Sequence, residues 1–149
     1  MEIRSYRESD LPGVLALCER EGWPSLVEDP ARANRVLTAP GVTTMIADDG
    51  GRVIGFAQLQ SDGAIQAHLS LIAVHPDFRR RGIARDLIAK ALAKAGGLRI
   101  DLLTDSAEGF YDALPHVRMP GYRIYPNYSG PDRDRPGVAW RNGRRVRKA

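Results

Sequence analysis

An uncharged run of strand-forming residues, Leu69–Val74, leads into a basic turn that contains glycine, and the turn leads into an amphipathic segment. The run is apolar enough to form a buried strand. It ends at His75-Pro76, because proline lacks an amide N–H and disfavours helical conformation in the residue before it. From Ile83 onward, apolar residues recur at helical spacing as far as Ala95, and Gly96-Gly97 ends the helix. With the order of the other expected elements (strand, helices, strands, then this helix, a strand and a helix), the unit predicts a mixed α/β sandwich.

The turn between the strand and the helix has the residues of an anion site. Three arginines, Arg79–Arg81, precede the small residues Gly82 and Ala84. The first turn of a helix offers unpaired N–H groups and a partial positive charge, and small side chains let phosphate oxygens approach those groups. The turn lacks the Gly-Lys-Ser/Thr of a P-loop and the Gly-x-Gly-x-x-Gly of dinucleotide-binding folds. It predicts a pyrophosphate site, and a solvated basic turn is the alternative.

The pattern Arg79-x-x-Gly82-x-Ala84, preceded by a strand that ends in Ala-Val-His-Pro, resembles the acetyl-CoA signature of the GNAT acetyltransferase superfamily. The resemblance implies an α/β fold of the α+β kind, with a mixed, mostly antiparallel sheet flanked by helices. It also implies an acetyl-CoA-dependent N-acetyltransferase. The residues expected to contact acetyl-CoA come from the strand, the turn and the region after the next strand, and they are Leu71, Ile72, Ala73, Val74, Arg79, Arg80, Arg81, Gly82, Ile83, Ala84, Arg85, Thr104 and Tyr111.

Length and composition favour one globular domain. The chain has 149 residues, of which 43% are hydrophobic and 27% are charged. We expect a single domain over residues 1–128 and a basic segment over 129–149. Cys18 has no partner for an internal disulfide, which favours a reducing compartment. No apolar run approaches the length of a membrane span, and the N-terminus lacks the apolar core of a signal peptide. We therefore predict a cytoplasmic protein that does not bind membranes.

Basic residues accumulate at the C-terminal end, where residues 132–149 contain seven Lys or Arg against two Asp. Such a segment can bind nucleic acid or acidic partners. We favour a solvated terminus and expect no nucleic-acid partner, because Trp140 is its one aromatic residue and no nucleic-acid motif accompanies it. The three histidines are scattered and lack the ligand spacing of a zinc site, so no metal is expected.

Periodicity and turn residues predict the remaining elements. Strands are expected over 2–6, 42–47, 52–60, 64–74, 98–104, 122–125 and 138–141. Helices are expected from Ser9 or Asp10 to Gly22, over 30–37, over 83–95, and over a short stretch capped by Asp105 or Ser106. The sequence Asp48-Asp-Gly-Gly51 predicts a hairpin. The segment 23–29 is expected to be irregular.

Tyr111 follows Phe110 in the short helix expected after the 98–104 strand. In GNAT enzymes a tyrosine in this helix, commonly within Phe-Tyr, stands near the sulfur of coenzyme A, so the resemblance implies that Tyr111 protonates the departing thiolate. A phenol with an ordinary pKa near 10 can return a proton to a thiolate. The alternative is an amphipathic ring with a hydrogen-bonded hydroxyl. After Leu114 the chain departs from the family, because several extra residues precede Gly121-Tyr122.

His68 is the best candidate for the base that an attacking amine requires, since an ammonium has no lone pair. The stretch Ala67–His75 resembles the corresponding strand of the arylalkylamine N-acetyltransferases, where histidines are implicated in proton removal. Strict alternation would put His68 on one face with Ser70, Ile72 and Val74. A hydrogen-bonded core or interface histidine is nearly as good an interpretation. The resemblance also puts the N–H of Ile72 on the thioester carbonyl, where it would stabilise negative charge.

The resulting hypothesis is direct transfer, in a ternary complex, of the acetyl group of acetyl-CoA to a primary amine of a small molecule or peptide. The acidic residues Glu21, Glu28 and Asp29 near the expected acceptor entrance favour a cationic amine. One alternative is a GNAT-like module that binds CoA without transferring acyl groups. Another is a protein- or ribosome-directed acetyltransferase that docks through its basic tail. Homodimerisation through the aromatic segment 122–128 is compatible with the implied fold.

Overall fold

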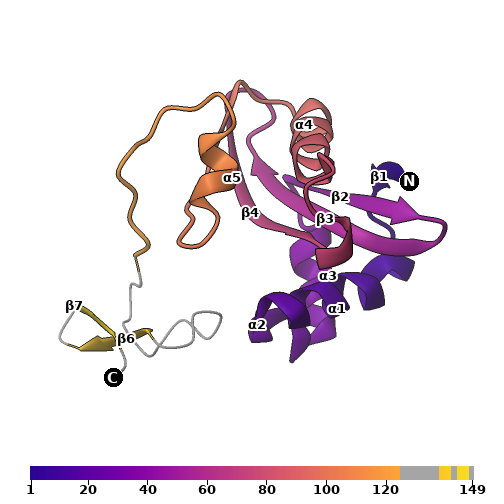
Figure 1. Ribbon diagram of the computed structural model, residues 1–149, viewed down its shortest axis with the longest axis horizontal. Coiled ribbons are helices and arrows are strands. Elements are labelled where there is room, and N and C mark those ends of the chain that lie inside the picture. The colour runs from indigo at the N-terminus through magenta and orange to yellow at the C-terminus, as the bar shows by residue number, and fades with distance from the viewer. Residues whose placement is uncertain (125–137, 142–143, 148–149) are drawn as a thin grey trace. The chain divides into compact units, whose positions relative to one another are not determined.

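The computed structural model describes residues 1–124 and the backbone of 138–141 and 144–147 (Figure 1). The chain divides into two compact units, Met1–Asp101 and Leu102–Ala149. In the first unit, five strands form one sheet in chain order: β1 (Glu2–Ser5), β2 (Val42–Asp49), β3 (Arg52–Ser61), β4 (Gln66–Val74) and β5 (Arg99–Asp101). Neighbouring strands from β1 to β4 are antiparallel, whereas β5 is parallel to β4. The predicted mixed, mostly antiparallel sheet is confirmed.

Helices cover both faces of this sheet (Figure 1). On one face lie α1 (Leu11–Glu21), α2 (Pro24–Val27) and α3 (Pro30–Thr38), and on the other lies α4 (Ile83–Ala95). Between the sheet and the first three helices, Phe56 and Ile46 of the sheet pack with Val14 of α1, all three at most 1% exposed. Burying side chains of this size stabilises the fold by roughly 1.5–3 kcal/mol each. These three residues lie in the core between the sheet and the first three helices.

The helix limits follow local signals. Gly22 ends α1 in the left-handed conformation with φ of 73°. Asp29 caps α3, since its carboxylate accepts a hydrogen bond from the N–H of Arg32 at 2.9 Å. The expectation of an irregular segment over 23–29 is wrong at Pro24–Val27, where proline starts the short helix α2 and Leu26 is buried.

Arg4 joins the first two strands to the turn that precedes α1. Its guanidinium donates two hydrogen bonds to the Asp10 carboxylate, both at 2.8 Å, and two to the Asp48 carboxylate, at 2.7 and 3.1 Å. The hydrogen bonds from Arg4 hold the pKa of Asp10 below its usual value, although burial opposes them. This ion cluster fixes β1 against β2.

The second unit contains the short helix α5 (Glu108–Asp112) and a two-stranded antiparallel sheet, β6 (Val138–Arg141) and β7 (Arg144–Arg147). Residue Ala107 precedes α5, so the expected caps at Asp105 and Ser106 are wrong; instead, Thr104 Oγ1 accepts a hydrogen bond from the N–H of Ala107 at 3.1 Å. The strand at 138–141 is confirmed. Residues 122–124 form no strand, and residue 125 lies outside the described residues.

Two further expectations concern the length of a strand and the limits of the domain. The strand expected over 98–104 is limited to the three residues of β5. A single domain over 1–128 with a separate basic segment stays a prediction. Among the residues that the structure describes, no helix combines the length and the apolar composition needed to cross a bilayer.

Candidate active site

Strand β4 has a partner along most of one edge but only at the start of the other. Its pairing with β3 runs from Ala67 to Val74, whereas its pairing with β5 covers only Gln66–His68. The N–H of His75 donates to the Ile54 carbonyl of β3 at 2.8 Å. The two-residue alternation of an antiparallel ladder then turns the N–H groups of residues 72 and 74 away from β3. These amides point to the edge that β5 leaves uncovered.

A β-bulge separates the two halves of β4. Gln58 of β3 pairs with Leu71, whereas the next residue, Leu59, pairs with Leu69. Ser70 is therefore an extra residue with no partner across the ladder. An extra residue of this kind shifts the alternation of side chains by one position.

The bulge corrects one prediction. Beyond it, Leu71 and Ala73 lie on the face of His68 and pack into the core beneath α1–α3. Ile72 and Val74 consequently face α4. The prediction that His68 shares a face with Ile72 and Val74 is wrong, because strict alternation does not cross the extra residue.

The turn between β4 and α4 combines left-handed backbone with unpaired amides. Arg80 and Gly82 have φ of 62° and 80°. A Cβ added at Gly82 would meet no atom within 4 Å. The N–H of Asp86 donates to the Gly82 carbonyl at 3.0 Å, so the amides of residues 83–85, which precede it, have no acceptor inside the helix. Open space over amides at the positive end of a 13-residue helix fits a phosphate group.

The arginines of this turn are exposed, but two of them also hold the turn in shape. Arg79 donates from Nε to the Val74 carbonyl at 2.9 Å and from Nη2 to the Glu21 carboxylate at 2.6 Å. Arg81 donates to the Asp77 carbonyl at 3.0 Å. Arg79 thus links the end of β4 to α1, a structural contact that the sequence pattern did not predict.

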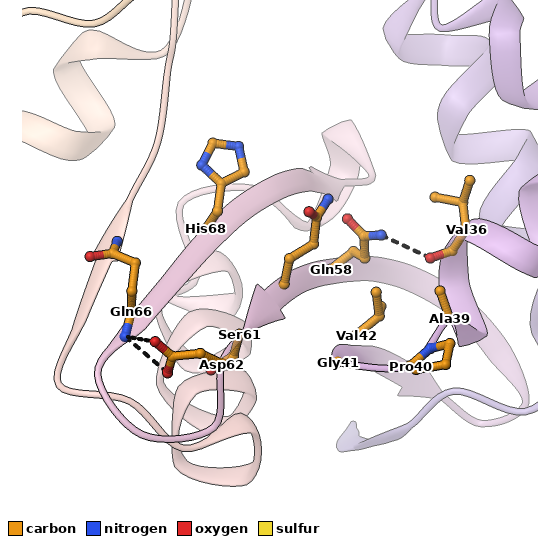
Figure 2. Close-up of a pocket in the computed structure, with 11 residues that line it drawn as sticks. Val36, Ala39, Pro40, Gly41, Val42, Gln58, Ser61, Asp62, Gln66 and His68 are labelled. Atoms are coloured by element: carbon orange, nitrogen blue, oxygen red, sulfur yellow. Dashed lines mark hydrogen bonds between the residues drawn. The ribbon is translucent and has the colours of Figure 1, made fainter.

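A pocket of about 710 Å³, open to solvent, lies where β2, β3 and β4 meet the end of α3 (Figure 2). Apolar groups come from the end of α3 and the loop after it, and polar groups come from β3, β4 and the turn between them. The lining residues are Val36, Ala39, Pro40, Gly41, Val42, Gln58, Gln60, Ser61, Asp62, Gln66 and His68. The exposed imidazole of His68 is therefore brought to a cavity, as a base for an acceptor would require.

The polar lining contains one residue that sequence reasoning missed. Gln58 is 1% exposed in the middle of β3, and its Nε2 donates to the Val36 carbonyl of α3 at 2.9 Å. A glutamine inside an otherwise apolar strand was the available signal. The three acidic residues expected at the acceptor entrance are absent from this lining: Glu21 pairs with Arg79, and Asp29 caps α3.

Thr104 and Tyr111 belong to the second unit. Tyr111 is half-buried in α5, where its ring packs edge-on against Phe110 with centroids 4.9 Å apart. Burial raises the pKa of the Tyr111 phenol above its usual value, so it is protonated at neutral pH. Within residues 1–124, no group of three or more His, Cys, Asp or Glu side chains is arranged to hold a metal ion.

Comparison with known proteins gives consistent matches. The family model described as acetyltransferase (GNAT) domain matches residues 40–114. An acetyltransferase of Pectobacterium atrosepticum is 32% identical over 124 residues, which span 78% of this chain and 87% of that protein. The N-alpha-acetyltransferase RimI of Mycobacterium tuberculosis is 30% identical over 117 residues, 74% of this chain and 71% of that protein. The structure of aminoglycoside N-acetyltransferase AAC(6')-Iy in complex with CoA superposes with a TM-score of 0.69 at 25% identity, covering 83% of this chain and 92% of that one.

Proposed function

This chain belongs to the GNAT acetyltransferase family, and from that premise we propose that it transfers the acetyl group of acetyl-CoA to a primary amine of a small molecule or peptide. One observation supports this most directly. Strand β4 has uncovered amides at one end and a pocket-lining histidine at the other, and it leads into a helix whose first amides are unpaired. A donor of acyl groups and an acceptor amine can therefore be bound along one strand.

The proposed donor site follows the path from β4 to α4. The pyrophosphate of acetyl-CoA lies on the amides of residues 80–85, with the exposed guanidinium groups of Arg80, Arg81 and Arg85 around it. The expected amide of Arg79 is not among them, because its N–H donates to the Pro76 carbonyl at 3.2 Å. The pantetheine lies along the edge of β4 at residues 71–74, and the expected contact of Thr104 with acetyl-CoA stays a prediction. The binding of CoA by the aminoglycoside N-acetyltransferase that this chain resembles supports this assignment.

Bound acetyl-CoA supplies a thioester whose carbonyl carbon a neutral amine attacks while the carbon–sulfur bond breaks. In the proposed site the N–H of Ile72 donates to the thioester oxygen and stabilises the charge that develops there. His68 removes a proton from the amine, directly or through water. Tyr111 donates its phenolic proton to the leaving thiolate, and its raised pKa keeps that proton available at neutral pH.

The acceptor is proposed from the chemistry of the relatives and of the pocket. Both named relatives are N-acetyltransferases, one described as an N-alpha-acetyltransferase and one as an aminoglycoside N-acetyltransferase. The pocket has an apolar wall from α3 and three glutamine side chains from β3 and β4. Such a lining suits a compact amine with both apolar and hydrogen-bonding groups.

Release of CoA thiol from acetyl-CoA, measured over a panel of small amines, amino acids and short peptides, tests the proposal. We expect His68→Gln and Tyr111→Phe each to lower turnover by about 10²-fold, the usual scale of general acid–base catalysis, with little change in CoA affinity. His116→Gln and Tyr122→Phe are matched controls, because they change the same residue types outside the proposed machinery.

The two catalytic assignments fail separately. Full turnover in His68→Gln removes the histidine from the chemistry, and full turnover in Tyr111→Phe removes the tyrosine. If CoA binds and no amine in the panel accelerates thiol release, the result contradicts amine acetylation and favours a CoA-binding module.

A further inference from the structure

Gln58 presents a buried oxygen without a partner in the wall of the pocket. Among the described residues, its Oε1 is the one buried side-chain polar atom that lacks a hydrogen bond. The orientation of the amide is fixed, because the Val36 carbonyl can only accept and must therefore face Nε2. The oxygen lies on the side of the amide away from Val36 (Figure 2). Buried polar atoms in native proteins nearly always have a partner, so this one points to a bound ligand.

The position of Gln58 relates this oxygen to the proposed chemistry. Gln58 lies opposite Leu71 in the ladder, directly beside the bulge of β4. Two residues further along β3, Gln60 lies opposite His68, on the same face of the sheet. Gln58 and His68 both line the pocket. A ligand that fills this pocket therefore lies beside both His68 and Gln58.

The neighbouring polar groups are already engaged. Gln60 donates to the Ser70 hydroxyl at 2.7 Å. One carboxylate oxygen of Asp62 accepts hydrogen bonds from the N–H groups of residues 64–66. The Oε1 of Gln66 accepts from Arg99 at 2.7 Å. Gln58 differs from these groups because its oxygen is both buried and unpaired.

We propose that Gln58 Oε1 selects acceptors that carry a second N–H or O–H donor beside the amine that is acetylated. The inference rests on the proposed function, because it assigns the pocket to the acceptor. A ligand with such a donor completes the hydrogen bonding of the buried oxygen. A ligand with a methyl group in its place leaves the oxygen unpaired and shielded from water, which commonly reduces affinity by roughly 10- to 100-fold.

Matched pairs of amines test this selection. The pairs are ethanolamine with 2-methoxyethylamine, leucinamide with its N,N-dimethylamide, and 2-amino-1-phenylethanol with its methyl ether. The Kd of each amine is measured on the full chain saturated with CoA, and thiol release from acetyl-CoA is measured in parallel. For at least one pair, we expect the wild-type protein to bind the donor-bearing member at least about tenfold more tightly. In Gln58→Leu the two members of that pair should bind equally.

Thr44→Val is the matched control. Thr44 lies opposite Gln58 on β2, is buried, and donates from Oγ1 to the Leu37 carbonyl of α3 at 2.8 Å. Both substitutions therefore remove a buried donor to α3, but Thr44 is outside the pocket lining. Thr44→Val should preserve the ratio of the two Kd values. A preserved ratio would show that the effect of Gln58→Leu comes from the missing amide oxygen and not from a weakened attachment of α3.

The outcomes distinguish this inference from the proposed function. A Kd ratio that persists in Gln58→Leu, or that is absent in the wild-type protein, overturns the role of Gln58 even when thiol is released. A Kd ratio that is present in the wild-type protein and in Thr44→Val but lost in Gln58→Leu supports the role of Gln58. If the Kd ratios follow this pattern but the wild-type protein releases no thiol, acetyl transfer is contradicted and the role of Gln58 in binding is not. Absence of binding and of thiol release for all three pairs overturns both.

Discussion

Gly82 is the residue on which the donor site depends most directly, because it is left-handed and has open space where a side chain would lie. Leucine there would cost about 1–2 kcal/mol in backbone strain and would fill the space proposed for pyrophosphate. We expect Gly82→Leu to weaken CoA binding at least about tenfold by calorimetry, since one lost phosphate contact is worth more than 1.4 kcal/mol.

Gly50 provides the control for that substitution. It lies in the hairpin between β2 and β3 with φ of 63°, and a Cβ there also meets no atom within 4 Å. Gly50→Leu should therefore carry similar strain and bind CoA normally. Equal losses of CoA affinity in the two variants would contradict the phosphate assignment.

These residues show how far a sequence specifies a site. Gly82 was predictable, because the turn into a helix constrains both backbone and side-chain size. Gln58 was not, because its importance depends on which atom of α3 lies opposite its amide, and that pairing joins residues 22 positions apart in the chain. The roles of His68, Ile72 and Tyr111 stay predictions that the proposed variants test.

At the scale of elements, hydrophobic pattern and turn chemistry predicted most strands and helices, but not the bulge of β4. Apart from Ser70, the stretch Leu69–Val74 is apolar on both faces, so the pattern of apolar residues does not show that the alternation shifts at Ser70. The bulge appears only in the pairing with β3. β5 is shorter than predicted, because its ladder with β4 ends at Asp101.

The ion cluster of Arg4 yields a prediction about how β1, β2 and the turn before α1 are held together. Asp10→Asn removes a carboxylate that is 6% exposed and accepts two hydrogen bonds from Arg4. We expect the free energy of unfolding in urea to fall by about 1–3 kcal/mol at pH 7, because one of the two carboxylates in a partly buried ion cluster loses its charge. Asp49→Asn is the control, because it removes an exposed carboxylate that pairs with the N-terminal ammonium group. It should change the free energy of unfolding by less than about 1 kcal/mol.

The difference in free energy of unfolding between the wild-type and Asp10→Asn proteins should depend on pH, in a direction set by the pKa of Asp10. The pKa of Asp10 is lower in the folded protein than its usual 3.8, so its stabilisation is present above that value and is lost as pH falls through the folded pKa. The free energies of unfolding of the wild-type and Asp10→Asn proteins should therefore differ by the same amount from about pH 5 to 7. Below about pH 3.8 this difference should shrink as the pH falls. A difference that stays the same down to pH 2.5 would show that packing rather than charge is responsible.

At the scale of the whole molecule, the buried hydrophobic residues of the described chain all fall between Val14 and Ala91, whereas the excess of basic residues lies in 132–149. The strands of the described residues form a five-stranded sheet, β1–β5, and a two-stranded sheet, β6–β7. The excess of basic residues follows from composition along the chain, whereas the extent of the core depends on packing that composition does not specify.

A chain ending at residue 128 tests what the basic segment contributes. The truncation keeps the core, the turn before α4 and Tyr111, and it removes β6 and β7 as a complete pair. If the chain acts on small amines, the truncated protein should bind CoA with unchanged affinity and release thiol at a rate within about threefold of the full chain, because the residues proposed for the donor and acceptor sites all precede residue 129. If the segment instead docks the enzyme on RNA, the full chain should bind RNA with an affinity that falls steeply with salt, and truncation should abolish that binding. Loss of turnover with small amines after truncation would contradict both outcomes, because it would place the basic segment within the acetyltransferase itself.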